Sequence, residues 1–145
     1  MANVKIDITV DVTKLLKVQP GGGKISDQSI VSMNQTGGFF DPATQNTAKL
    51  ITKAEIGTKI KWKIKSGTTS DNLDLGDYVP EDRNMLSVFI AKPGKVADDE
   101  IDGDIIATKP TQNFKTQYTL SFCLKKNPVI VWTWDPWVEY PQPPI

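Results

Sequence analysis

The C-terminal part of the chain carries a cluster of aromatic residues that could bind a ligand or another protein. Trp132, Trp134 and Trp137 lie within six residues, and they are three of the four tryptophans in the sequence. Tryptophan rings stack on flat apolar surfaces such as sugar rings, and they are enriched in protein interfaces. Asp135 and Tyr140 place hydrogen-bonding groups beside them. We therefore predict a surface for a glycan ligand or for self-association at Trp137, Tyr140 and Asp135.

The spacing of these tryptophans separates them into two groups. Side chains alternate between the faces of a strand, so Trp132 and Trp134 share one face. Pro136 has no amide hydrogen and is expected to end the strand at the residue before it. Three exposed tryptophans would present about 500 Å² of apolar surface, near the limit for a soluble monomer. We expect Trp132 and Trp134 to lie in the core with Trp62, and Trp137 to be more exposed.

An acidic segment resembles the first half of a calcium-binding loop. Asp98, Glu100 and Asp102 occupy positions one, three and five, and Gly103 occupies position six. The second half is missing, because position twelve is Lys109 where such a loop needs a bidentate glutamate. A solvated turn is the favoured interpretation, with no resident cofactor. Calcium would need further carboxylates from another loop, which offers three: Asp71, Asp74 and Asp77.

Other catalytic chemistry has little support in the sequence. The chain has no histidine, which excludes Ser-His-Asp and Cys-His nucleophiles and most zinc sites. Cys123 is the single cysteine, so it cannot form an internal disulfide, and we expect it to be inert. A hydrolase that uses two carboxylates is the remaining enzymatic alternative. We expect a protein that is not an enzyme.

The charge balance points away from nucleic acid and membranes as partners. There are 17 basic and 17 acidic residues, so the formal net charge is zero. Nucleic-acid and anionic-membrane binders usually carry a basic excess, and low net charge permits self-association. The four lysines of the segment 59–65 are interpreted as a solvated strand face. The first residues show no signal-peptide core, so a cytoplasmic protein is expected.

The elements that must position these residues are predominantly strands. Apolar and polar residues alternate in four long segments: 4–12, 59–65, 114–124 and 129–135. A compact apolar run at 85–91 is interpreted as a central strand, and 66–82 as a polar, turn-rich stretch. Residues 13–18 fit one helical turn. With seven or eight strands in all, these patterns predict an all-β antiparallel immunoglobulin-like sandwich. It would form one domain over residues 1–145, with an extended proline-rich tail at 141–145.

Several segments in order resemble the AidA/PixA family of bacterial inclusion-body proteins. They are Ile6–Val12, Thr47–Leu50, Ile56–Trp62, Ser66–Asp74, Gln112–Phe114, Tyr118–Phe122 and Trp134–Pro136. The Trp-Asp-Pro sequence is the most distinctive of them. The resemblance implies a non-enzymatic cytoplasmic protein that accumulates to high levels, sometimes as crystalline inclusions, with links to stress or host association. Together with the zero net charge and the clustered tryptophans, the resemblance indicates a homo-oligomer. The aromatic tail leaves an alternative, which is a carbohydrate-binding module or lectin with or without calcium.

Overall fold

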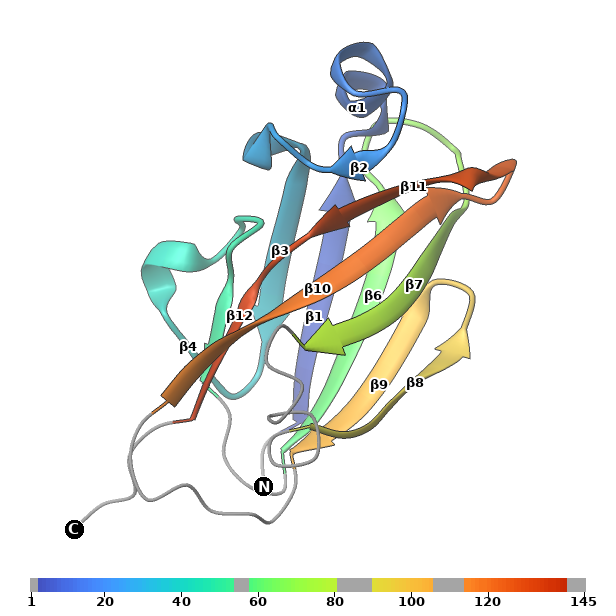
Figure 1. The fold of residues 1–145 in the computed structure, drawn as a ribbon. Helices are drawn as coiled ribbons and strands as arrows, with labels where there is room; N and C mark the ends of the chain where they lie inside the picture. Colours follow the sequence, from blue (N-terminus) through green and yellow to red (C-terminus); the bar gives the residue numbers. More distant parts are fainter. Residues whose placement is uncertain (1–2, 54–57, 81–89, 106–113, 141–145) are drawn as a thin grey trace, which may run out of the picture.

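The computed structural model describes residues 3–53, 58–80, 90–105 and 114–140, and these form two packed β-sheets with one short helix across one end (Figure 1). Twelve strands and one α-helix occur among the described residues. Two single turns of 3₁₀-helix lie in the connections, at Gln28–Ile30 and Pro42–Thr44. The all-β expectation is confirmed.

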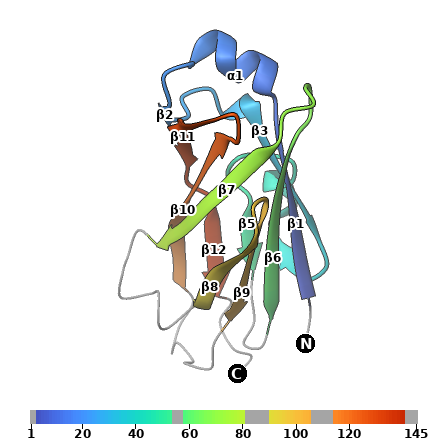
Figure 2. The same ribbon diagram turned by 90° about the vertical axis from the view of Figure 1, so that its right-hand side faces the viewer.

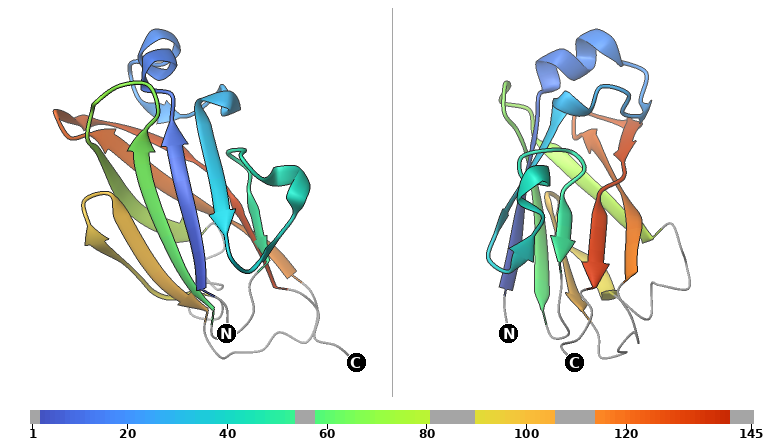
Figure 3. Two further views of the ribbon diagram at one scale, coloured as in Figure 1. Left: turned by 180° about the vertical axis from the view of Figure 1, so that it is seen from behind. Right: turned by 90° about the vertical axis from the view of Figure 1, so that its left-hand side faces the viewer.

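The first sheet has five strands in the order β3-β1-β6-β9-β8 (Figure 3, left). Its strands are β1 (Asn3–Val10), β3 (Val31–Thr36), β6 (Lys59–Ser66), β8 (Ile90–Ala97) and β9 (Glu100–Ile105). β1 and β6 run parallel, whereas the other neighbours are antiparallel. The buried faces of β1 and β6 carry the alternating apolar residues, and their lysines point outward.

The second sheet has seven strands around the long strand β10. Its strands are β2 (Gly23–Lys24), β4 (Phe39–Phe40), β5 (Ile51–Lys53), β7 (Leu73–Pro80), β10 (Phe114–Leu124), β11 (Asn127–Trp134) and β12 (Trp137–Tyr140). β10 pairs antiparallel with β7 along one edge and with β11 and then β12 along the other. β2 and β5 add in parallel to β11 and β12.

The expectation of a wholly antiparallel sandwich is wrong, because both sheets are mixed. Three neighbouring pairs are parallel: β1–β6, β11–β2 and β12–β5. Parallel neighbours need a crossover, and here the chain between β1 and β6 passes through strands of the other sheet. Alternation in a sequence indicates which face of a strand is buried and carries no information about the direction of its neighbours. The strand count of seven or eight was also too low, because several strands have only two or three residues.

β7 lies within the stretch that was interpreted as polar and turn-rich. Leu73 and Leu75 are buried, and Asp74 between them is half-buried on the opposite face, so this is a strand with one face in the core. Gly76 faces Ser121 of β10 closely enough that a Cβ atom would come within 2.1 Å of the Ser121 hydroxyl oxygen. Most of the expected central strand at 85–91 lies outside the described residues. Its last two residues begin β8, which is an edge strand.

The core between the sheets combines many aliphatic side chains with a few large buried aromatic ones. Trp62, Trp132 and Trp134 are each at most 1 % exposed, which confirms the prediction that these three tryptophans are internal. Phe122 stacks on Trp132 and meets Trp134 edge-on. The indole N–H of Trp62 donates a hydrogen bond across the sandwich to the hydroxyl of Tyr118, at 3.1 Å. The two layers are therefore joined by packing and by a buried polar contact.

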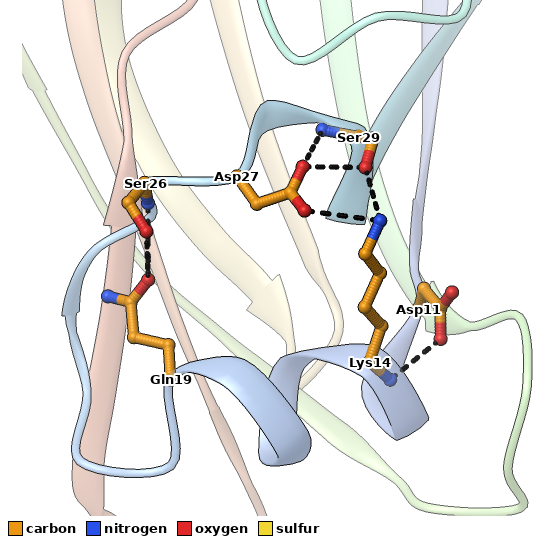
Figure 4. A network of polar contacts seen from close by, with 6 residues as sticks. All are labelled: Asp11, Lys14, Gln19, Ser26, Asp27 and Ser29. Atoms are coloured by element: carbon orange, nitrogen blue, oxygen red, sulfur yellow. Dashed lines mark hydrogen bonds and ion pairs between the residues drawn. The ribbon is translucent and has the colours of Figure 1, made fainter.

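Helix α1 (Val12–Val18) closes one end of the sandwich (Figure 2). Asp11 caps it by accepting a hydrogen bond from the Lys14 amide at 3.0 Å, and Val12 and Leu15 insert into the core. The segment after the helix is tied down by polar side chains (Figure 4). The Lys14 ammonium lies 3.1 Å from the Asp27 carboxylate, and Gln19 accepts a hydrogen bond from the Ser26 amide. Hydrogen bonds from Ser29 and then Lys14 lower the pKa of Asp27.

Candidate functional site

β11 and β12 both pair with β10 in one continuous register, and the Asp135-Pro136 sequence separates them. Trp134 pairs with Leu120, and Trp137 pairs with Gln117, so the register is the same on both sides of the interruption. The strand therefore ends at Trp134, one residue earlier than expected, and resumes at Trp137 as β12. Pro136 is buried, as is Trp134 two residues before it. Asp135 and Trp137 consequently lie on the outer face of the second sheet.

Asp135 is held firmly on this outer face. One carboxylate oxygen accepts a hydrogen bond from the Thr119 hydroxyl at 2.8 Å, and the other lies 2.7 Å from the Lys24 ammonium. The side chain of Asp135 is only 10 % exposed, whereas that of Lys24 is 70 % exposed. The Asp135 backbone carbonyl also accepts a hydrogen bond from the side-chain amide of Gln117 at 3.1 Å. Asp135 is thus a fixed acceptor with an exposed cation beside it.

Trp137 is half-buried on the same face. Its backbone N–H donates to the Leu50 carbonyl at 3.0 Å, and in the sheet it lies between Gln117 of β10 and Ile51 of β5. The structure therefore brings two of the three expected site residues, Asp135 and Trp137, to one surface. Tyr140 is the last residue of β12, opposite Phe114, and its side chain lies outside the described part of the chain. Lys24 and Thr119 belong to this surface and were missed, because they come from distant segments.

The acidic segment forms a β-hairpin where a loop was expected. Asp98 lies in the turn, whereas Glu100 and Asp102 belong to β9. Glu100 and Asp102 pair with Lys63 and Lys61 of β6, and the Lys61 ammonium lies 3.6 Å from the Glu100 carboxylate. Across the residues that the structure describes, no group of three or more carboxylate, cysteine or histidine side chains converges on one point. The resemblance to a calcium loop is therefore not reproduced in space.

Two aspartate-bearing loops do meet at the end of the sandwich near α1. Asp71 and Asp98 line one hollow there, but each is paired with a lysine of the β10–β11 turn. The Lys126 ammonium lies 2.8 Å from the Asp71 carboxylate, and the Lys125 ammonium lies 2.6 Å from that of Asp98. Asp74 is paired with Lys95. These lysines supply the positive charge that calcium would bring, so the hollow is electrostatically balanced without a metal ion.

Replacing Lys125 with methionine should raise the pKa of Asp98. The hydrogen bond and charge of Lys125 hold that pKa below its ordinary value, so the pair stabilises the fold at neutral pH and this contribution is lost as pH falls through the lowered pKa. The measurement is a carbon-detected NMR titration of the side-chain carboxyl groups. Asp71, whose pKa is lowered first by Lys126, is the internal control and should not move. An unchanged Asp98 titration would show that the ion pair does not form in solution.

Cys123 has the environment of an unreactive thiol. It lies on β10 and is 9 % exposed. Burial, followed by the nearby negative charge of Asp74, raises the pKa of Cys123. A raised thiol pKa lowers the fraction of thiolate, which is the nucleophilic form. The placement agrees with the expectation of an inert cysteine.

Comparison with known proteins supports the fold at the level of structure alone. No family model and no curated protein sequence matches this chain. The structure is similar to the crystal structure of an inclusion body protein, PixA, from Burkholderia cenocepacia J2315, with a TM-score of 0.68 and 94 % of each chain covered. The two sequences are 12 % identical. This likeness confirms the PixA-like fold that the sequence resemblance implied. Within the described residues, no helix has the length and apolar character needed to cross a membrane.

Proposed function

We propose that this protein is a non-catalytic, self-associating protein of the inclusion-body type. The observation that carries the proposal is the likeness to PixA, which extends over 94 % of the chain and includes both sheets. The zero net charge adds support, because copies of the protein do not repel one another over long range. The proposal includes accumulation in the cytoplasm and a role in stress or host association.

The outer face around Asp135 and Trp137 is the surface that we assign to contacts between copies. Trp137 offers a half-buried ring that can be covered further, and tryptophan is the residue type most enriched at the centres of interfaces. Asp135 and Lys24 add a fixed charge pair at its border. An interface of this kind has an apolar centre and a polar rim.

Replacing Trp137 with alanine should weaken assembly while the protein remains folded. The wild-type protein is expected to form species larger than a monomer as its concentration rises, and the variant to need about tenfold more protein, as for the loss of about 1.4 kcal/mol. Sedimentation velocity over a concentration series measures both. Phe39 is the control, because it is an aromatic residue 66 % exposed on β4, the edge strand two strands away from β12 in the same sheet. A wild-type protein that remains monomeric at millimolar concentration would contradict the proposal.

Glycan binding at the same face is the second candidate function. Trp137 can stack on a sugar ring, and Asp135 is an oriented acceptor for sugar hydroxyls, since Thr119 and Lys24 fix its carboxylate. A glycan array with and without calcium tests this candidate, and specific binding should disappear in the Trp137→Ala variant. No binding in either condition would exclude it.

Imaging of cells that express the protein tests where it accumulates. We expect dense foci in the cytoplasm that become fewer when Trp137 is replaced with alanine. A matched Phe39→Ala strain, expressed at the same level, should keep its foci. Diffuse protein at high expression would contradict the inclusion-body proposal.

A further inference from the structure

The turn that carries Lys24 is held firmly against the second sheet by Gln19 (Figure 4). The side-chain amide of Gln19 donates to the backbone carbonyls of Gly22 and Lys24, at 3.1 Å and 2.8 Å. Its side-chain oxygen accepts a hydrogen bond from the Ser26 amide at 3.1 Å. The backbone carbonyl of Gln19 accepts from the indole N–H of the buried Trp132 at 2.8 Å. One residue therefore closes the turn and joins it to the core.

The backbone of Lys24 is fixed to β11 on both sides. Before it, Gly22 has a φ angle of 85°, and a Cβ atom there would lie 2.7 Å from the Val131 carbonyl oxygen. Only glycine adopts this conformation readily and allows so close an approach. Lys24 itself pairs with Thr133, and the next amide, that of Ile25, donates to the Thr133 carbonyl at 2.8 Å. The position of Lys24 on the sheet is therefore well defined.

The ammonium end of Lys24 is oriented as well. It lies 2.7 Å from the carboxylate of Asp135, which Thr119 holds in turn. The Lys24 side chain nevertheless remains largely exposed to solvent. A lysine on a protein surface normally has many rotamers, and a ligand that binds it bears the entropy cost of fixing one of them. Because Asp135 already restricts Lys24, a ligand meets an accessible cation at a reduced entropy cost.

This cation lies close to the outward tryptophan of the same face. Asp135 and Trp137 are separated by two positions in a continuous register with β10, which corresponds to roughly 7 Å along a strand. The Lys24 ammonium is in contact with Asp135. A flat ring that stacks on Trp137 therefore brings the groups at its border to Asp135 and Lys24.

We propose that this face binds a glycan that contains a uronic acid, and that Lys24 selects the carboxylate of that sugar. The proposal rests on glycan binding, the second candidate function above, and names the class of glycan. Trp137 stacks on the sugar ring, and Asp135 accepts from a ring hydroxyl. An ammonium group carries three N–H donors, so Lys24 binds the sugar carboxylate while it keeps its contact with Asp135.

The charges around Lys24 favour a singly charged group over a phosphate. The residues that neighbour Lys24, Asp135 and Trp137 in the sheet are uncharged: Thr133, Thr119 and Gln117. One ammonium matches one carboxylate, whereas a doubly charged phosphate would meet the negative charge of Asp135 without a second cation from these neighbours. The carboxylate of an acidic peptide would also meet Lys24, but it would not bring a flat ring onto Trp137. A uronic acid supplies both groups in one unit.

Oligogalacturonate and its methyl ester test the role of the carboxylate, because the two differ in charge and share the same rings. In a titration followed by amide NMR shifts, the wild-type protein should bind the acid about fivefold more tightly than the ester, and less selectively at high salt. Lys24→Met should make the two affinities equal without changing that for the ester. Lys63→Met is the control, since Lys63 is an exposed lysine on β6 of the other sheet, and it should keep the preference.

Gln19→Ala tests whether the turn positions Lys24. The variant loses the hydrogen bonds to Gly22, Lys24 and Ser26, so the ammonium should be less well oriented. We expect the ratio of acid to ester affinity to fall toward one, while the affinity for the ester and the circular dichroism spectrum stay unchanged. A variant that weakens both ligands equally would show that Gln19 has only a general structural role, and that the turn does not orient Lys24.

The outcomes separate this inference from the proposed function. Equal wild-type affinities for the acid and the ester, or a preference that persists in Lys24→Met, would overturn the selection of a carboxylate and leave glycan binding intact. Equal binding of a hexaglutamate peptide would also overturn it, because the sugar ring would then be unnecessary. No binding of either oligosaccharide or of any arrayed glycan would refute this inference together with the glycan candidate. Self-association is judged independently by sedimentation.

Discussion

Replacing Trp134 with alanine is expected to lower the free energy of unfolding by about 3–5 kcal/mol, the usual cost of truncating a large buried aromatic residue. Trp134 has no exposed surface, meets the ring of Phe122 edge-on, and directs its indole N–H toward the sulfur of Met33 at 3.3 Å. Truncation removes these contacts and leaves a cavity between the two sheets. Because domains of this size are stable by only about 5–15 kcal/mol, the variant should unfold at much lower urea.

Trp137→Ala is the matched control for this measurement. The two tryptophans are three residues apart, but Trp137 is half-buried on the outer face of the sheet. Its truncation removes less buried surface and opens no enclosed cavity, so the expected loss is less than about half of that for Trp134. Urea unfolding at dilute protein concentration measures both. Similar losses for the two variants would contradict the assignment of faces on either side of the Asp-Pro step.

Replacing Tyr118 with phenylalanine is expected to cost about 1–3 kcal/mol, because the indole N–H of Trp62 loses its acceptor. Both residues are at most 1 % exposed, so water cannot replace the hydroxyl without rearrangement. Tyr78→Phe is the control, since the Tyr78 ring lies 5.0 Å from that of Tyr118 but its hydroxyl does not bind Trp62. Equal costs for the two variants would show that the hydrogen bond across the sandwich contributes nothing.

The same pair of tyrosines predicts how stability changes in alkali. Burial raises the pKa of Tyr118 and of Tyr78 above the ordinary value of a phenol. A group whose pKa is raised in the folded state contributes stability below its unfolded pKa and loses it as pH rises toward the folded value. Unfolding should therefore become easier above about pH 10, and Tyr118→Phe should reduce this dependence. Tyrosinate absorbance recorded with the unfolding curve measures both events.

The function that we propose uses surfaces and not a reaction centre. Asp71 and Asp98 are paired with lysines, and the single thiol has a raised pKa. The surface on which the proposal relies carries the outward Trp137 of β12 and the nearby Asp135. Trp137 pairs with Gln117 of β10, and Phe122 of the same strand packs against the buried Trp132 and Trp134. The same segment thus supplies both the core and the proposed contacts.

The alternation of apolar and polar side chains was enough to predict the type of most elements and the faces that they bury. Alternation in β1, β6, β10 and β11 identified the inward residues, including Trp62, Trp132 and Trp134, because the two-residue period of a strand is a local property. It also predicted that Trp137, beyond the Asp135-Pro136 sequence, is more exposed than Trp132 and Trp134. The same pattern missed β7, because the aspartates and the glycine in its sequence are typical of a loop.

The neighbours of each strand and the partners of the charged residues depend on how the whole chain folds. The parallel pairing of β1 with β6, the ion pair of Asp135 with Lys24, and the lysines that neutralise Asp71 and Asp98 all join segments far apart in the chain. Such contacts depend on the path of the whole chain, so the order of side chains along one segment does not predict them.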